Sequence, residues 1–571
     1  MKSAGATVVA ILLLSVVPQA RPVQGTASIE GIVVKAGSNQ PVQGATVELT
    51  AIAPRTTEGS SEVNPGIITV SVREAETDGR VLSFTTTTGR DGKFSIRNVP
   101  ATTGYQLIAI NYPEYVPAQY GQRVASVPGR PIDLASGQQM RDIRIEMTPS
   151  ATIAGRVVDE VGQPVRNAIV ELRRPWYLEG WRLLADSNEV IQRVRGVGKS
   201  NRAAAAQTNN KGEFQFAGLV PAHYYLRTTR THDADAQRID LHAGDNVRNV
   251  RIVMQQPLSL RLRGTVVLSG SGQSVDSGTI SLVGRDAVPL YQNVMTSSSG
   301  IKDGRFDLIV REPGDYYLLA TGRDRQGLRL GRKAIRVADA DIDGVRLELE
   351  PAFDISGSVT TEGQTSGPLA PMSLALFPST VGVPKIDAID LPFPRGTFRL
   401  RNVTVGDFRI EVAPILRVPP SSLVQASLEN AYVKSIKLGN TDVLNDGLRI
   451  QSVREGSSLE VVISMRGGML DGRVLDQDKM PVGTVTVVLV PETSRRHRGD
   501  LYKNVYADDS GHYRLYGIAP GNYKLFAWEH VEDGAWQDPD FIKLYDNRGT
   551  SVRIQEDQHG TTDTPLIRAW N

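Results

Sequence analysis

The amino-acid sequence predicts an all-β protein of about five tandem antiparallel β-sandwich domains that follow an N-terminal signal peptide. Three observations predict this fold: one phrase recurs five times, apolar and polar residues alternate with a period of two, and Gly-containing dipeptides separate the alternating runs. Such alternation half-buries a strand, and Asp-Gly, Lys-Gly or Ser-Gly supplies the positive φ that tight hairpins need. Short strands at this spacing are typical of sandwiches of about seven strands.

The recurrent phrase carries two aromatic residues at a nearly constant separation, which is 10 residues in four copies and 11 in the first. The first aromatic residues are Phe94, Phe214, Phe306, Phe398 and Tyr513, and the second are Tyr105, Tyr224, Tyr316, Phe408 and Tyr523. A spacing held five times indicates repeated structural units, and we expect both rings to face the core of their unit.

A second phrase opens each unit with a strand that contains a glycine. These glycines are Gly31, Gly155, Gly264, Gly357 and Gly472, so the repeat has the length of one small domain. After a signal peptide at 1–25, the two phrases predict sandwiches at 26–149 (with an insertion at 54–77), 150–256 (insertion 175–207), 257–350, 351–466 (insertion 414–445) and 467–571, of which the third and fourth are divergent.

The first residues have the three parts of a secretory signal peptide. Lys2 gives a positive start, residues 6–17 form an apolar run, and small residues follow at Ala20 and Gly25, which places cleavage within 20–25. The alternative is an uncleaved anchor, but the run is shorter than the roughly 20 apolar residues that a spanning helix needs. We therefore expect an exported chain, in the periplasm, on the outer surface or outside the cell, without a transmembrane segment in its mature form.

Composition excludes several functional classes. The 571 residues include no cysteine, which excludes disulfides, cysteine-ligated zinc, iron–sulfur clusters and a thiol nucleophile. Lys and Arg number 64 against 62 Asp and Glu, a net charge of +2. This balance argues against nucleic acid as a partner, because nucleic-acid-binding proteins usually carry a strong basic excess.

The paired phrases G-x-V-x-D-x-x-G-x-P-V-x-x-A-x-V and D-x-x-G-x-F…G-x-Y resemble the carboxypeptidase regulatory-like domain. The second copy (155–172 and 210–226) and the fifth copy (472–490 and 508–525) match best. The resemblance implies an Ig-like or prealbumin-like sandwich, found in tandem in proteins of the bacterial envelope or secretome. In metallocarboxypeptidases this domain accompanies the catalytic domain and is not itself catalytic, and the starch-binding-type fold is a structural neighbour.

A search for catalytic motifs predicts no active site, no bound metal and no cofactor. None of the seven histidines has a glutamate three residues later, as the zinc site of the peptidases requires; they are His223, His232, His242, His497, His512, His530 and His559. The acidic turns 341–344 and 508–511 leave Ca²⁺ binding open as an alternative to plain turn chemistry. A further alternative is that the carboxyl groups of Glu529 and Asp533 act as acid and base in the cleavage of a glycosidic bond.

Two clusters contain aromatic residues beyond those of the recurrent phrase. Trp176 and Trp181 lie in the insertion of the second unit, and Trp528, Trp536, Phe541 and Tyr545 lie near the end of the last. Loops on a rigid sandwich often carry binding residues, and flat rings beside carboxylates suit sugars. Three interpretations stay open: these rings fill the end of the sandwich, bind a sugar or bind a protein partner.

The sequence therefore predicts a non-enzymatic secreted or envelope-associated protein that binds or supports other molecules, with polysaccharide or an envelope protein as partner. The most specific version of this hypothesis is carbohydrate binding through aromatic loops. The alternatives are an accessory subunit of an extracellular hydrolase or of an outer-membrane uptake system, or a hydrolase itself. The oligomeric state stays open.

Overall fold

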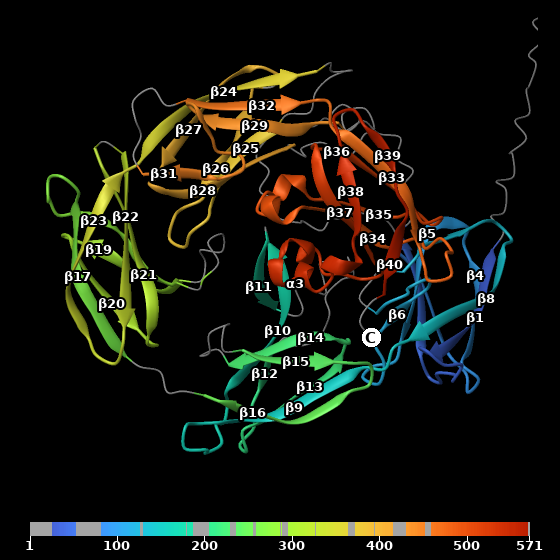
Figure 1. The fold of residues 1–571 in the computed structure, drawn as a ribbon. Helices are drawn as coiled ribbons and strands as arrows, with labels where there is room; N and C mark the ends of the chain where they lie inside the picture. Colours follow the sequence, from blue (N-terminus) through green and yellow to red (C-terminus); the bar gives the residue numbers. More distant parts are fainter. Residues whose placement is uncertain are drawn as a thin grey trace, which may run out of the picture. The chain divides into compact units, whose positions relative to one another are not determined.

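The computed structural model describes residues 26–52, 81–125, 129–178, 180–186, 205–228, 236–254, 259–285, 287, 295–325, 327–363, 372–392, 394–414, 430–451 and 458–568 (Figure 1). The expected signal peptide (1–25) and the insertion at 54–77 lie outside these residues. The chain divides into two compact units, one of residues 1–151 with 217–220 and one of the remainder. Below, each repeat is called a module, numbered one to five along the chain.

The first module packs two sheets against each other. Its strands are β1 (Ala27–Lys35), β2 (Thr46–Ile52), β3 (Val81–Thr87), β4 (Lys93–Val99), β5 (Thr102–Ile110), β6 (Ala118–Gln119), β7 (Ile132–Leu134) and β8 (Gln139–Met147). One sheet has the order β4-β1-β8, and the other has the order β3-β2-β5-β6 with β7 paired to β5. The inward residues form one core that includes Ile29, Leu49, Phe94 and Tyr105.

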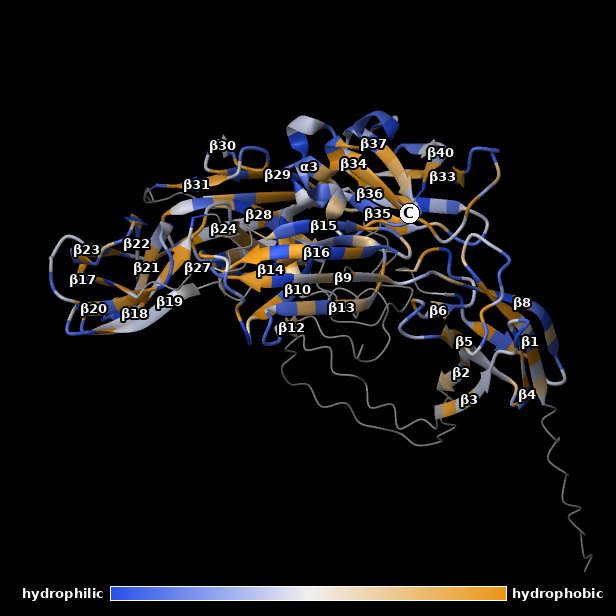
Figure 2. Cartoon of the chain, turned by 90° about the horizontal axis from the view of Figure 1, so that it is seen from below, coloured by the Kyte–Doolittle hydropathy of each residue, from blue (hydrophilic) through white to orange (hydrophobic). Residues whose placement is uncertain are grey.

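The second module repeats this plan. Its strands are β9 (Ala151–Val158), β10 (Ile169–Leu178), β11 (Trp181–Asp186), β12 (Ala205–Gln207), β13 (Glu213–Leu219), β14 (Ala222–Thr228), β15 (Gln237–Leu241) and β16 (Asn246–Val253). The sheets have the orders β13-β9-β16 and β11-β10-β14-β15, with β12 paired to β10. Exposed and buried residues alternate along β13, and Figure 2 shows the same alternation as blue and orange bands.

The third module, predicted as a divergent sandwich, closes into a barrel. Its strands are β17 (Leu260–Leu268), β18 (Ser277–Gly284), β19 (Met295–Lys302), β20 (Arg305–Val310), β21 (Gly314–Asp324), β22 (Gly327–Val337) and β23 (Ile342–Pro351). The barrel order is β17-β20-β19-β18-β21-β22-β23. Closure follows from pairing at both edges, where Lys302 of β19 meets Arg305 of β20 and Leu330 of β22 meets Glu350 of β23.

The fourth module is again a sandwich of two sheets. Its strands are β24 (Phe353–Glu362), β25 (Met372–Pro378), β26 (Ile386–Leu391), β27 (Gly396–Val403), β28 (Gly406–Pro414), β29 (Tyr432–Leu438), β30 (Thr441–Asp442), β31 (Leu448–Ile450) and β32 (Ser458–Ser464). The sheets have the orders β27-β24-β32-β29-β30 and β26-β25-β28-β31.

The fifth module has its two layers joined into one eight-stranded sheet. Its strands are β33 (Gly468–Leu475), β34 (Thr486–Pro491), β35 (Lys503–Tyr506), β36 (His512–Ile518), β37 (Gly521–Trp528), β38 (Thr550–Ile554), β39 (His559–Thr561) and β40 (Thr564–Ile567). Five short helices lie between them: η2 (Thr493–Arg495), η3 (Gly499–Leu501), η4 (Ala535–Gln537), α3 (Pro539–Lys543) and η5 (Asp546–Arg548). The all-β fold of tandem sandwiches is thus confirmed.

Each module departs from pure antiparallel pairing because its first strand pairs in parallel with its closing strand, and in the fifth module β37 also pairs in parallel with β40. The pairs are β1 with β8, β9 with β16, β17 with β23, β24 with β32, and β33 with β39 and β40. Parallel first and last strands let the chain enter a module at one end and leave it at the other. This arrangement suits tandem repetition with linkers of only a few residues.

The opening glycine of each module lies beneath the first aromatic ring. A β-carbon at Gly31, Gly155, Gly264 or Gly472 would lie 2.8–2.9 Å from an atom of Phe94, Phe214, Phe306 or Tyr513, and still closer to Phe398 at Gly357. A backbone carbonyl of the closing strand, or in the fifth module that of Thr562 between β39 and β40, also lies close to each such β-carbon. The two sequence phrases are therefore the two halves of one packing arrangement.

A β-bulge follows the first aromatic residue in most modules. The fourth residue after that ring has positive φ at Asn98 (58°), Gly218 (67°), Asn402 (56°) and Gly517 (61°). The ladder slips by one residue there, as between β1 and β4 or between β24 and β27. Asn and Gly tolerate this conformation best. The third module has Val310 at this position, and its β17–β20 ladder runs without a slip.

Candidate functional site

The aromatic residues near the end of the chain form a second core on the fifth module. Strand β37 faces the sandwich core with Tyr523, Leu525 and Ala527, whereas Phe526 and Trp528 point to the opposite face of the sheet. Trp528 is 1% exposed and Trp536 is 4% exposed. Both rings are therefore closed to a ligand in this conformation.

Ring contacts hold this cluster together. Phe526 stacks on Trp528 with centroids 5.0 Å apart and an interplanar angle of 13°. Tyr545 meets Trp528 edge to face at 5.6 Å, and Phe541 lies 5.0 Å from Tyr545. Phe541 and Tyr545 keep part of their surface exposed. The structure thus brings together the four residues predicted here, as packing partners of one another.

Local sequence explains why the chain folds back over this sheet. Asp538 begins α3, and its carboxylate accepts hydrogen bonds from the backbone N–H groups of Asp540 (2.8 Å) and Phe541 (3.2 Å). Pro539 stands at the first helical position, where its missing N–H costs nothing. Gly534 takes the left-handed conformation (φ 79°) before η4.

The predicted pair Trp176 and Trp181 lies on a β-hairpin, not on a loop of an insertion. Strand β10 continues past its sandwich partners and turns at Gly180 (φ 81°) into β11, so that Trp176 pairs with Leu183 and Leu178 with Trp181. Trp176 is partly buried, whereas Trp181 at the tip is 37% exposed.

Within the second unit, the hairpin packs against the aromatic cluster of the fifth module. The guanidinium of Arg174 donates to Glu532 at 3.3 Å, and the side chain of Arg174 is only 5% exposed. Tyr177 lies 6.2 Å from Phe541, measured between ring centroids. A β-carbon at Gly534 would lie 3.2 Å from Tyr177, so a larger residue would press on this contact.

Burial perturbs the ionisable groups at this contact. Burial is the largest effect on Glu532 and would by itself raise its pKa, but the charges of Arg174 and His530 and a backbone hydrogen bond together outweigh burial and hold that pKa below its ordinary value. Burial lowers the pKa of His530, so the folded state favours the neutral ring. Arg174 Nε and Trp528 Nε1 have no hydrogen-bond partner among the described residues.

A groove of about 950 Å³ lies beside this contact in the second unit. The hairpin tip supplies Trp181 and Arg182, the fourth module supplies segments around Arg409 and Asn445, and the fifth supplies segments around His497 and Asp540; these make up its walls. Its lining therefore combines an exposed aromatic ring with amide, carboxylate and guanidinium groups.

Hydrogen bonds fix the joint between the fourth and fifth modules, and one of their partners, Asn445, lines this groove. Arg498 is 5% exposed and donates to Asn445 Oδ1 at 3.2 Å and to the carbonyl of Val433 at 3.4 Å, while Asp500 pairs with it at 2.6 Å. The Tyr432 hydroxyl donates to Glu556 at 2.5 Å. Sequence reasoning missed Arg498, whose role depends on a partner module.

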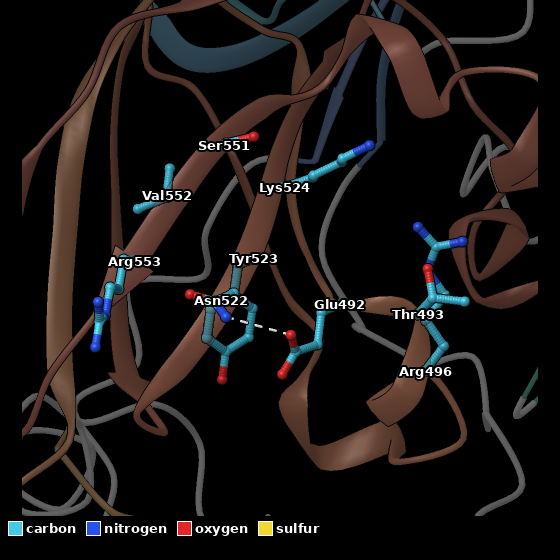
Figure 3. Close-up of a pocket in the computed structure, with 9 residues that line it drawn as sticks. All are labelled: Glu492, Thr493, Arg496, Asn522, Tyr523, Lys524, Ser551, Val552 and Arg553. Carbon is cyan, nitrogen blue, oxygen red and sulfur yellow. Dashed lines mark hydrogen bonds between the residues drawn. The ribbon is translucent and has the colours of Figure 1, made fainter.

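A smaller pocket of about 440 Å³ lies entirely on the fifth module, lined by β37, β38 and η2 (Figure 3). Figure 3 shows the Glu492 carboxylate beside Asn522, whose side-chain amide donates to it at 3.3 Å. Thr493 and Arg496 line both this pocket and the groove. The two hollows are therefore neighbours, with η2 between them.

The acidic turns and histidines weighed from the sequence have other partners. Asp341 and Asp343 pair with Arg263 at 3.3 and 2.9 Å, and Asp508 accepts hydrogen bonds within its own turn. In the part of the chain that the structure describes, no three His, Asp or Glu side chains form a group able to hold a metal ion. His232 lies outside that part.

Comparison with known proteins adds no family. No protein-family model matches the chain, and no curated protein matches it. The carboxypeptidase regulatory-like identity therefore stays a prediction. Among the described residues, none of the helices is both long and apolar enough to cross a membrane.

Solved structures with some likeness to the chain include three bacterial pilins. A streptococcal ancillary pilin is 12% identical with a TM-score of 0.22, covering 57% of this chain and 99% of its own. GBS52, a minor pilin of Streptococcus agalactiae, is 14% identical with a TM-score of 0.21 and coverages of 40% and 95%. BcpA, the major pilin subunit of Bacillus cereus, is 10% identical with a TM-score of 0.14 and coverages of 73% and 99%. At TM-scores this low the likeness defines neither the fold nor the function of this chain.

Proposed function

We propose that this chain is a non-enzymatic binding protein that acts outside the cytoplasm and holds a polysaccharide in the groove of its second unit. The exposed ring of Trp181 in the wall of that groove carries the proposal. A flat indole face stacks on the apolar face of a sugar ring, and neighbouring polar groups bind the hydroxyls.

The composition of the groove favours a sugar over a protein partner. Asn445, Gln537 and Asp540 lie in the lining, and amide and carboxylate groups match the alternating donors and acceptors of sugar hydroxyls. A protein interface of similar affinity is usually centred on a desolvated apolar core with several large anchors. Of the aromatic side chains that line the groove, Trp181 is exposed, whereas Phe408 and Tyr502 are buried.

A carboxylate of the groove already has a structural role, which supports binding without catalysis. Asp538 is 6% exposed, and its side chain is engaged by two backbone N–H groups at the start of α3. Incubation of the full chain with each bound polysaccharide, followed by a reducing-end assay, tests this point. Release of reducing ends above that of a heat-denatured sample would contradict the non-enzymatic proposal.

Binding is tested by affinity electrophoresis and pull-down of the full chain against a panel of neutral and acidic polysaccharides. Trp181→Ala is expected to lower affinity at least tenfold, because the stacking face is lost. Tyr506→Ala is the matched control, since Tyr506 is 72% exposed but lies outside the groove. Equal binding by the wild type and Trp181→Ala, or no binding to any polysaccharide, would overturn the proposal.

A further inference from the structure

The pocket of the fifth module has the composition of a site for an acidic group. It is lined by Glu492, Thr493, Arg496, Asn522, Tyr523, Lys524, Ser551, Val552 and Arg553 (Figure 3). Three of these side chains are cationic and one is anionic. Trp181 does not line this pocket, so the pocket is distinct from the part of the groove that Trp181 forms, although Thr493 and Arg496 line both.

Strand pairing sets the spacing of the polar groups. Asn522 of β37 pairs with Arg553 of β38, and Lys524 pairs with Ser551. Because alternate residues of a strand share a face, these four side chains lie on one face of the sheet as two adjacent cross-strand pairs. Tyr523 and Val552, which alternate with them, point toward the core of the sandwich.

Ion pairs at the rim leave Arg553 as the cation that is open to a ligand. Asp546 binds Arg496 at 2.7 Å and Lys524 at 3.0 Å, and these contacts lower the pKa of Asp546. Arg553 is exposed and forms no ion pair with any described residue. With Asp546 included, the pocket has one positive charge in excess, which matches a group with a single negative charge.

We propose that this pocket binds the carboxylate of a sugar acid, so that the polysaccharide held by the groove is an acidic one. The inference rests on the proposed function, since the same glycan chain passes from Trp181 across Thr493 and Arg496 into the pocket. The hydroxyls of Thr493 and Ser551 and the amide of Asn522 match the hydroxyls that flank such a carboxylate. Arg553 supplies the charge-assisted hydrogen bond.

The test compares polygalacturonate with neutral dextran, using the full chain at low salt. Arg553→Gln is expected to lower affinity for polygalacturonate about tenfold and to leave dextran affinity unchanged, because one charge-assisted contact is lost. Arg473→Gln is the matched control: it removes the same charge from an exposed position on β33, outside the pocket. Equal polygalacturonate affinity in the two variants would overturn the inference.

The failure of this inference is separable from failure of the proposed function. Trp181→Ala is expected to weaken both glycans, whereas Arg553→Gln weakens only the acidic one. Where no polysaccharide binds at all, saturation-transfer NMR with free galacturonate and galactose probes the pocket directly. A galacturonate signal that Arg553→Gln abolishes supports the pocket, and equal signals from galacturonate and galactose, or none, contradict it.

Discussion

The ring of Phe306 lies directly across Gly264 of the neighbouring strand, where a β-carbon on the glycine would be 2.9 Å from Cε1 of the ring. The two residues are register partners in the β17–β20 ladder. The ring covers the backbone that the glycine leaves open, and the same pair recurs in all five modules. This relationship explains why the glycine and the first aromatic residue occur together in each repeat.

Gly264→Ala is expected to destabilise the third module by about 1–3 kcal/mol, because the added methyl group meets both the Phe306 ring and the carbonyl of Val345. Gly300→Ala is the matched control, since Gly300 lies in β19 with no atom within 4 Å of its would-be β-carbon. The control is expected to change stability by no more than about 0.5 kcal/mol. Hydrogen exchange read on peptides of this module measures both; equal effects of the two variants would contradict the packing.

Removal of the ring itself probes the same pair from the other side. Phe214 is 5% exposed and Tyr513 is 1% exposed, so Phe214→Ala and Tyr513→Ala are each expected to cost about 3–5 kcal/mol in their own module. The loss should be confined to the module that carries the substitution, because each has its own core. Local hydrogen exchange separates the modules, whereas a single unfolding midpoint of the whole chain does not. Near-neutral effects would mean that the rings contribute little to the cores.

The sequence predicted the parts of the fold that local residues encode. The opening glycine, the aromatic spacing and the turn dipeptides each act over one strand or one hairpin, and they were sufficient for the all-β class. Asn98 and Asn402 also mark the bulges, since Asn is enriched among residues with positive φ. Closure of the third module into a barrel combines the pairing of β22 with β23, at Leu330 and Glu350, with the pairing of β23 with the distant first strand β17, and no local sequence pattern predicts this combination.

The sequence contains a pattern that indicates the burial of Trp528. Polar and apolar residues alternate in strands that have one solvent-exposed face. Residues 487–490 (VVLV) and 525–528 (LFAW) instead have no polar residue at any position. A continuous apolar run is typical of a strand buried on both faces, which is what β34 and β37 are. The groove itself was beyond prediction, because Trp181, Asn445 and Asp540 come from three modules.

The pair of Arg174 and Glu532, whose side chains are 5% and 22% exposed, is expected to behave differently from an exposed pair. Arg174→Met or Glu532→Met alone leaves an unpaired buried charge, at a cost of about 3–5 kcal/mol to the docked hairpin, and the double variant should cost clearly less than the sum. Arg156 and Glu213 of the second module form the control pair at the same 3.3 Å, with side chains 54% and 45% exposed. Their coupling is expected at about 0–1 kcal/mol. A double-mutant cycle read by hydrogen exchange of β10 and β11 measures both, and additive effects at Arg174 and Glu532 would show that the buried contact is not formed in solution.

The pKa of His530 gives the same contact a dependence on pH. Burial lowers this pKa below its ordinary 6.5; Arg174 acts in the same direction, while Glu532 and Glu529 oppose it. Between the lowered value and 6.5 the unfolded chain binds a proton that the folded chain does not, so stability rises with pH in this window and is complete above it. Hydrogen exchange of residues 526–545 should therefore speed up between pH 7.5 and 5.5, after correction for the intrinsic exchange rate.

His530→Gln is expected to flatten that response, because it removes the titrating group and keeps a polar side chain of similar size. Glu532 contributes to stability separately. Because its pKa in the folded chain is lowered, its contribution to the free energy of unfolding is lost only as the pH falls below 4.5, the ordinary pKa of a glutamate. The two groups thus act in different pH windows, and the variant should retain the loss at the more acidic pH. A wild-type chain equally protected at pH 5.5 and 7.5 would show that His530 titrates freely and is not buried beside Arg174 in solution.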